Sequence, residues 1–182
     1  MKGAISGVKP CKGQFISRIF PTPKPDGSQR FKLNLKHLNN CISACHFKIE
    51  DHKTIIKLLS KNCFMATLDL KDAYFLLSVN KAHRKYLRFQ FNNSLYEFTC
   101  MPFGLNCTPL IFTKLMKPIL SFLRKSGLTS VLYLDDFLLL GKTFLECEQN
   151  WQETVKLLES LGFIINFPKS TPSPQHFFRF YL

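Results

Sequence analysis

Two apolar stretches in the second half of the chain flank a short polar turn. Residues 129–133 and 137–141 are rich in Leu, Val and Phe, and the turn between them carries Asp135 and Asp136. Apolar runs of this length, bounded by turn residues, predict a β-hairpin with two acids at its tip. Taken alone, two acids in a turn are simply solvated. Buried carboxylates, by contrast, need a partner, because an unpaired buried charge costs several kcal/mol.

A second apolar run also ends in acids. Phe64 to Leu68 predict a strand, Asp69 follows it directly, and Asp72 comes three residues later. Two strands that each end in a carboxylate can lie side by side in one sheet and bring their acids together. Mg²⁺ prefers such hard oxygen ligands. The pattern therefore predicts a metal site suited to two-metal phosphoryl or nucleotidyl transfer.

The remaining periodicity predicts an α+β fold. Residues 1–13 read as an ill-ordered lead-in. Strands are predicted at 15–21, 30–35, 85–91, 95–99 and 163–167, and helices from Asp51 and at 108–126 and 145–161. From residue 64 onward this order favours an antiparallel sheet backed by helices on one face.

Charge narrows the class of partner. The chain has 25 Lys and Arg residues against 12 acids, a formal charge of +13, and 46% hydrophobic residues. A basic domain with a real core favours a polyanion, most simply nucleic acid, although charge alone also suits an acidic membrane surface. The N-terminus lacks an apolar signal core and no run approaches ~18 apolar residues, which predicts an intracellular protein without a membrane span. The seven cysteines form no CxxC pair and are expected to be reduced.

Several motifs together resemble those of reverse transcriptases, in the order that this family has them. Residues 69–74 (Asp-Leu-Lys-Asp-Ala-Tyr) resemble motif A, residues 101–105 (Met-Pro-Phe-Gly-Leu) with Thr108, Pro109 and Phe112 resemble motif B, and residues 133–136 (Tyr-Leu-Asp-Asp) resemble motif C, the YxDD box. Residues 23–39 resemble the fingers hairpin, and residues 161–170 resemble motif D. The residues in and around these motifs are most similar to those of retrotransposon enzymes. Among these, they resemble the DIRS type more than the gypsy type.

The resemblance implies a right-hand polymerase palm, a ferredoxin-like or RRM-like antiparallel sheet backed by helices, with a fingers subdomain. It divides the chain into a lead-in at 1–13, a fingers-like segment at 14–62, a palm with motifs A to D at 63–176, and the start of a palm–thumb hairpin at 177–182. A thumb is not expected within these residues. The implied activity is RNA-directed DNA polymerisation, the transfer of a dNTP onto a primer 3′-hydroxyl on an RNA or DNA template.

The resemblance also implies roles for single residues. Asp69, Asp135 and Asp136 would be catalytic and would hold two Mg²⁺ ions, for which Mn²⁺ can substitute. Lys169 would protonate the departing pyrophosphate, and a solvated loop lysine is the alternative.

The substrate-binding set is wider. The residues implied in it are Lys24, Arg30, Leu70, Asp72, Ala73, Tyr74, Phe103 and Gly104. Lys24 and Arg30 would clamp the triphosphate, and either is otherwise a plain surface cation. The Leu70 carbonyl would contribute to metal binding. Asp72 would face the triphosphate or cap a short helix. Tyr74 would exclude a 2′-hydroxyl, or be an ordinary core aromatic.

Motif B and a basic stretch complete these expectations. Phe103 would pack beside the sugar, and Gly104 would allow close backbone approach. The residues His83, Arg84, Lys85 and Arg88 would follow the primer–template backbone, or form a charged strand face.

Two other functions fit parts of the pattern. One is an RNA-dependent RNA polymerase, against which Tyr133-Leu134 and Tyr74 argue, because those enzymes usually carry Gly-Asp-Asp. The other is a truncated or decayed retroelement copy that at most binds nucleic acid. The intact acids argue against long decay.

Overall fold

The structure is a computed structural model that describes residues 3–23, 27, 29–43, 58 and 63–175, without the side chains of residues 29 and 30. The chain divides into two compact units. The first unit comprises Met1–His46 and Tyr74–Leu110, and the second comprises Phe47–Ala73 and Ile111–Leu182. The predicted helix from Asp51 and the predicted hairpin start at 177–182 lie outside the described residues.

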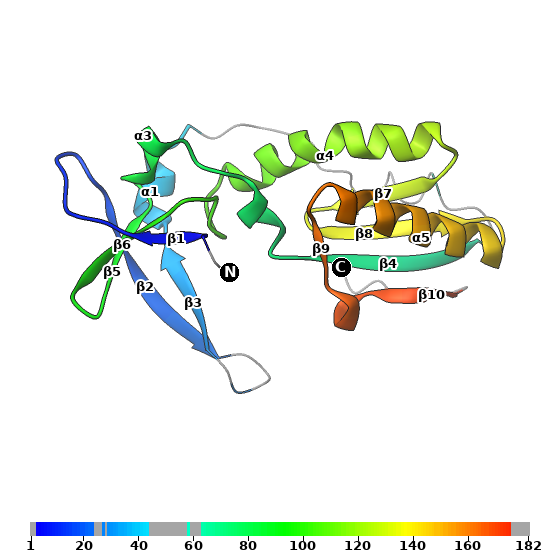
Figure 1. Cartoon of the computed structure of the whole chain (residues 1–182), viewed down its shortest axis with the longest axis horizontal. Helices are drawn as coiled ribbons and strands as arrows, with labels where there is room; N and C mark the ends of the chain where they lie inside the picture. Colours follow the sequence, from blue (N-terminus) through cyan, green and yellow to red (C-terminus); the bar gives the residue numbers. More distant parts are fainter. Residues whose placement is uncertain (1–2, 24–26, 28, 44–57, 59–62, 176–182) are drawn as a thin grey trace. The chain divides into compact units, whose positions relative to one another are not determined.

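A five-stranded sheet organises the first unit, with the order β1-β6-β5-β2-β3 (Figure 1). Its elements are β1 (Ile5–Gly7), β2 (Ile16–Pro23), β3 (Gln29–Asn34), α1 (Lys36–Asn40), α3 (Lys81–Arg84), β5 (Arg88–Phe91) and β6 (Ser94–Phe98). Strands β2 and β3 form the predicted hairpin, and β5 and β6 form the second one. Asn92 and Asn93 make the tight turn of the second hairpin at φ 46° and 59°, because Asn tolerates the left-handed conformation.

The prediction of an ill-ordered lead-in at 1–13 is wrong for the described residues. Strand β1 pairs antiparallel with β6, from Ile5 opposite Phe98 to Gly7 opposite Tyr96. The N–H of Val8 then donates to the carbonyl of Leu95 at 2.9 Å. The edge of β6 supplies the backbone partners, so a segment with little strand propensity of its own still becomes a strand.

The expectation that Arg88 contacts a nucleic-acid backbone is also wrong. Arg88 is 7% exposed. Its guanidinium pairs with Glu97 at 2.9 Å and donates to Gln14 at 2.7 Å. This buried pair anchors residues 9–14 to the β5–β6 hairpin, and a buried charge satisfied in this way is structural.

A four-stranded antiparallel sheet with the order β10-β4-β8-β7 organises the second unit, and β9 pairs with the end of β4 (Figure 1). Its elements are β4 (Phe64–Lys71), α4 (Thr108–Lys125), β7 (Thr129–Tyr133), β8 (Asp136–Gly141), α5 (Phe144–Ser160), β9 (Ile164–Ile165), η2 (Phe167–Lys169) and β10 (Thr171–Gln175). The unit boundary falls in the first turn of α4 and in the 3₁₀ helix η1 (Ala73–Leu76). The predicted α+β class, an antiparallel sheet backed by helices, is confirmed.

Helix α5 lies on one defined face of this sheet. A Cβ on Gly141 would meet the backbone nitrogen of Cys147 at 2.3 Å, so only glycine allows α5 to approach this closely. Side chains alternate along strands, and therefore Leu139 and Phe137 share this face with Gly141. The acid Asp136 falls on the opposite face.

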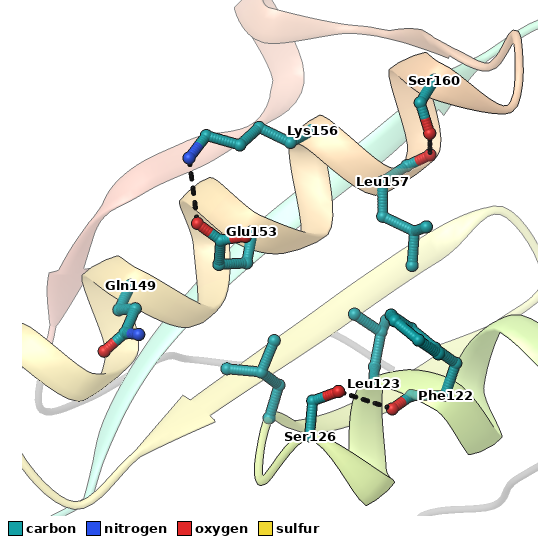
Figure 2. Close-up of a pocket in the computed structure, with 9 residues that line it drawn as sticks. Phe122, Leu123, Ser126, Gln149, Glu153, Lys156, Leu157 and Ser160 are labelled. Atoms are coloured by element: carbon teal, nitrogen blue, oxygen red, sulfur yellow. Dashed lines mark hydrogen bonds and ion pairs between the residues drawn. The ribbon is translucent and has the colours of Figure 1, made fainter.

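Helices α4 and α5 line a groove of about 470 Å³ (Figure 2). Phe122 and Leu123 of α4 face Glu153 and Leu157 of α5 across it. The groove therefore lies on the helix side of the sheet, away from the face that carries the paired acids.

The C-terminal part of the second unit differs from the predicted secondary structure. The strand expected at 163–167 is reduced to Ile164–Ile165, because η2 begins at Phe167. Strand β10 was not predicted, since it contains Pro172 and Pro174. It lies at the sheet edge beside β4, where prolines that cannot donate are tolerated.

Candidate active site

Strand register brings the first and third motif acids together. Asp69 of β4 lies directly opposite Asp136 of β8. Residues opposite each other in an antiparallel pair have Cβ atoms about 4.5–5.5 Å apart, on the same face. The N–H of Leu70 also donates to the carbonyl of Asp135 at 3.1 Å, which ties the hairpin turn to the end of β4.

The turn itself is strained. Tyr133 pairs with Asp136, which leaves Leu134 and Asp135 as a two-residue loop. Leu134 has φ 57°, a left-handed conformation that costs a side chain about 1–2 kcal/mol. Such strain clusters at functional sites, where the surrounding structure holds it in place.

Asp135 and Asp136 both have raised pKa values. Burial raises the pKa of Asp135, and the neighbouring Asp69 raises it further. For Asp136, burial and then the charges of Asp135 and Asp69 raise the pKa to about 6, although its side chain is exposed at the sheet rim. Lys169 lowers both pKa values and therefore lies close enough to act on both carboxylates.

A closed ring of hydrogen bonds surrounds Asp69. The Asn166 side-chain amide donates to Asp69 Oδ1 at 2.5 Å, and the Asn166 N–H donates to the Asp69 carbonyl at 2.9 Å. The Asp69 N–H donates to Ser170 Oγ at 3.1 Å, and this hydroxyl donates to the Asn166 carbonyl at 3.0 Å. The turn η2, which carries Lys169, is thereby fastened to the end of β4. Sequence reasoning included Asn166 and Ser170 in the resemblance to motif D but gave neither residue a role.

The donor set fits a divalent cation. Asp69 lies close enough to Asp135 and Asp136 to raise the pKa of both, and carboxylate oxygens are the ligands that Mg²⁺ prefers. Within the described part of the chain, no three acidic, His or Cys side chains form a preformed metal cage.

The first unit holds the aromatic residues of the substrate-binding prediction. Tyr74 is 7% exposed and its ring lies 4.9 Å from that of Phe103, which is 44% exposed. Gly104 has φ 91°, and nothing lies within 4 Å of the position of a Cβ. Asn39 holds this loop, because its amide donates to the Gly104 carbonyl at 2.9 Å and its Oδ1 accepts from the Asn106 N–H at 3.0 Å.

The structure describes only some of the other residues predicted to bind substrate. Lys24 and the side chain of Arg30 lie outside the described residues. Asp72 has φ 53°, whereas an N-cap residue is typically extended, so its conformation does not favour the capping alternative. Ala73 is buried, and the Leu70 backbone lies opposite Ile165 in β9.

Positive charge is concentrated in the first unit. That unit contains 12 Lys and Arg residues against two acids, whereas the second contains 13 against 10, so +10 of the +13 belongs to the first. No helix among the described residues is long and apolar enough to cross a membrane.

An antiparallel sheet backed by helices, with acids paired across two strands, defines an α+β protein with a candidate site for nucleotidyl transfer. Residues 22–180 match the family model of reverse transcriptase (RNA-dependent DNA polymerase). The chain therefore belongs to the reverse transcriptase family.

Curated relatives are polyproteins of retroviruses and retrotransposons. The chain is 27% identical over 176 residues to the Gag-Pro-Pol polyprotein of Human T-cell leukemia virus 2. It is 26% identical over 169 residues to the Transposon Tf2-3 polyprotein of Schizosaccharomyces pombe. Each match covers 92% of this chain but only 12% of the relative.

Solved structures show the same fold. The native Prototype Foamy Virus protease–reverse transcriptase matches with a TM-score of 0.79 at 20% identity, over 93% of this chain and 22% of that one. The foamy viral enzyme in complex with an RNA/DNA hybrid matches with a TM-score of 0.73 at 21% identity, over the same shares of each chain.

Proposed function

We propose that this chain is the catalytic domain of a retroelement reverse transcriptase, which adds dNTPs to a primer 3′-hydroxyl on an RNA or DNA template. The observation that carries the proposal is the register of Asp69 opposite Asp136, with Asp135 in the adjoining turn. Acids from two distant segments thus lie at neighbouring ends of the two central strands, which suits two-metal nucleotidyl transfer.

Asp69, Asp135 and Asp136 would hold two Mg²⁺ ions, the cofactor typical of this family, and Mn²⁺ would substitute. When bound, the ions supply the activation of the primer 3′-oxygen and the stabilisation of the leaving pyrophosphate. The carboxylates balance the ionic charge and fix where the reacting oxygens sit. The Leu70 carbonyl would add a further oxygen ligand.

Lys169 would protonate the leaving pyrophosphate. Its positive charge lowers the pKa of both Asp135 and Asp136, which supports this role. The hydrogen bonds that fasten η2 to β4 keep this lysine within reach.

Tyr74 and Phe103 would select the sugar. Tyr74 follows Asp69 by five residues, and its ring packs against Phe103 next to the open backbone of Gly104. Forcing a 2′-hydroxyl against the packed ring would cost about 1–3 kcal/mol or more, which disfavours rNTPs. Asp72 and Ala73 would line the nucleotide side, and Lys24 and Arg30 would bind its phosphates.

The first unit would bind the primer–template. Its charge of +10 provides the phosphate neutralisation that such binding needs. We assign residues 14–62 to a fingers-like segment, 63–176 to the palm and 177–182 to a palm–thumb connection. The DIRS type remains our preferred subfamily over the gypsy type.

Primer extension tests the proposal. The chain is incubated with an RNA template, a labelled DNA primer, Mg²⁺ and one dNTP, beside Asp135→Asn and the exposed control Glu153→Gln. We expect extension by the wild type and the control and none by Asp135→Asn, with duplex binding nearly equal in all three. Duplex binding without any extension by the wild type would contradict the enzyme and favour the inactive copy.

A further inference from the structure

The amide of Asn166 makes a contact that its position in the chain does not require. Asn166 stands at the N-cap of η2, where an asparagine side chain usually accepts a backbone N–H of the same turn. It makes no such capping bond here. Its Nδ2 instead donates to Asp69 Oδ1 at 2.5 Å, across 97 residues of sequence. The side chain is thus committed to a carboxylate of the acid site.

The contact engages one of the two carboxylate oxygens of Asp69. Asp69 Oδ1 is an acceptor, and only the NH₂ end of the Asn166 amide can donate to it, so the amide has one productive orientation. The Asn166 N–H also donates to the Asp69 carbonyl at 2.9 Å, which holds the two main chains beside each other. Oδ2 is the oxygen that this bond leaves unused.

We propose that Asn166 is a positioning residue that fixes the Asp69 carboxylate so that Oδ2 points to the bound metal ions. This inference rests on the function proposed above. Outer partners of metal-binding carboxylates hold their ligands in one orientation, and their loss typically weakens metal affinity 10–100-fold. Asn166 itself contacts neither metal nor substrate.

Mn²⁺ affinity, measured by the paramagnetic resonance signal of the free ion, provides a readout that does not depend on catalysis. The test variant is Asn166→Ser, because serine still suits an N-cap and preserves η2, while its hydroxyl is too short to reach Oδ1. We expect Mn²⁺ affinity to fall about 10-fold or more. The single tryptophan, Trp151, lies 6.2 Å from Phe167 of η2, so unchanged Trp151 fluorescence reports an intact turn.

Two further variants separate positioning from stability. Thr143→Ala removes the N-cap of α5, whose hydroxyl accepts from the Glu146 N–H at 3.1 Å, and lowers the melting temperature by a few degrees without touching the acids. Ser170→Ala opens the hydrogen-bond ring at the Asp69 backbone and leaves the Asn166 amide bond to Oδ1 in place. We expect both to bind Mn²⁺ within about 3-fold of the wild type, well short of the 10-fold loss typical of an outer partner.

The outcomes distinguish the two proposals. Binding by Asn166→Ser within 2-fold of the wild type, or an equal loss in Thr143→Ala or Ser170→Ala, would overturn the positioning role alone. A wild type that does not bind Mn²⁺ would overturn the proposed function and this inference with it. If Asn166→Ser does not fold, the same comparison is made with Asn166→Gln, which retains a donor on a longer side chain and should bind less tightly than the wild type.

Discussion

Removal of one charge from the acid site should stabilise the protein when metal is absent. Asp136→Asn keeps the shape of the side chain. It removes the cost of partly burying a charge and the repulsion with Asp135 and with Asp69, its cross-strand partner. Like charges directly opposite in a sheet are destabilising. We therefore expect the variant to be more stable than the wild type in EDTA at pH 7.5.

The pKa sets the size and the pH range of this effect. The folded-state pKa of Asp136 is raised from 3.8 to about 6. Each pKa unit corresponds to about 1.4 kcal/mol, which gives an upper limit of roughly 3 kcal/mol. Asp136 is exposed, so solvent screening reduces the expected gain to about 1 kcal/mol, or roughly 2–4 °C in melting temperature.

The sign follows from the direction of the shift. A carboxyl with a raised folded-state pKa contributes its stability in full below pH 3.8 and loses it as the pH rises through about 6. The advantage of Asp136→Asn should therefore be absent near pH 4, grow between pH 4 and 6, and be constant above pH 7.

Urea unfolding in EDTA, followed by circular dichroism at several pH values, measures the difference. Glu153→Gln is the control, because its partner Lys156 forms an exposed i,i+3 pair that contributes little. Added Mg²⁺ should reverse the order, since only the wild type retains all three ligands. A variant that is less stable than the wild type at pH 7.5, or that has the same advantage at pH 4 and pH 7.5, would refute a destabilising charge at Asp136.

Three other predictions address nucleic acid, sugar selection and the core. Primer–template affinity should fall about 10³-fold or more between 50 and 200 mM salt if the first unit neutralises several phosphates, and a nearly flat salt dependence in a fluorescence titration would contradict this. Tyr74→Val should incorporate rNTPs that the wild type excludes, with a partial loss of rate. Single-nucleotide incorporation measures the preference for dNTP over rNTP, and an unchanged preference would show that Tyr74 is only a core aromatic. Asn150→Ala should lower the free energy of unfolding in urea by about 2–4 kcal/mol, because the Asn150 amide donates to the carbonyls of Thr129 and Leu140. A loss below about 0.5 kcal/mol would show that water replaces the amide.

Elements with strong local periodicity could be predicted from the sequence. The β7–β8 hairpin, strand β4 and helices α4 and α5 lie within a few residues of their predicted bounds. Their apolar positions repeat with the period of the element, and glycine ends both helices. The sequence also indicated that the acids of these two segments could come together, but the register that places Asp69 opposite Asp136 was not predicted.

Features that depend on distant partners could not be predicted. Strand β1 exists because β6 has a free edge, and β10 because β4 has one; neither is encoded by its own residues. The bond from Asn166 to Asp69 joins residues 97 apart, and a local pattern that favoured a strand through residue 167 concealed it. The burial of Arg88 depends on residues 9–14 folding over it.

An anomalous-diffraction map of crystals grown with Mn²⁺, primer–template and dNTP tests the central claim most directly. The account predicts two peaks roughly 3.5–4 Å apart, bound by the carboxylates of Asp69 and Asp135, with Asp136 beside them. Crystals of Asp135→Asn should lose at least one peak. Density for the dNTP without any metal peak at these acids, or Mn²⁺ bound only elsewhere, would contradict the claim.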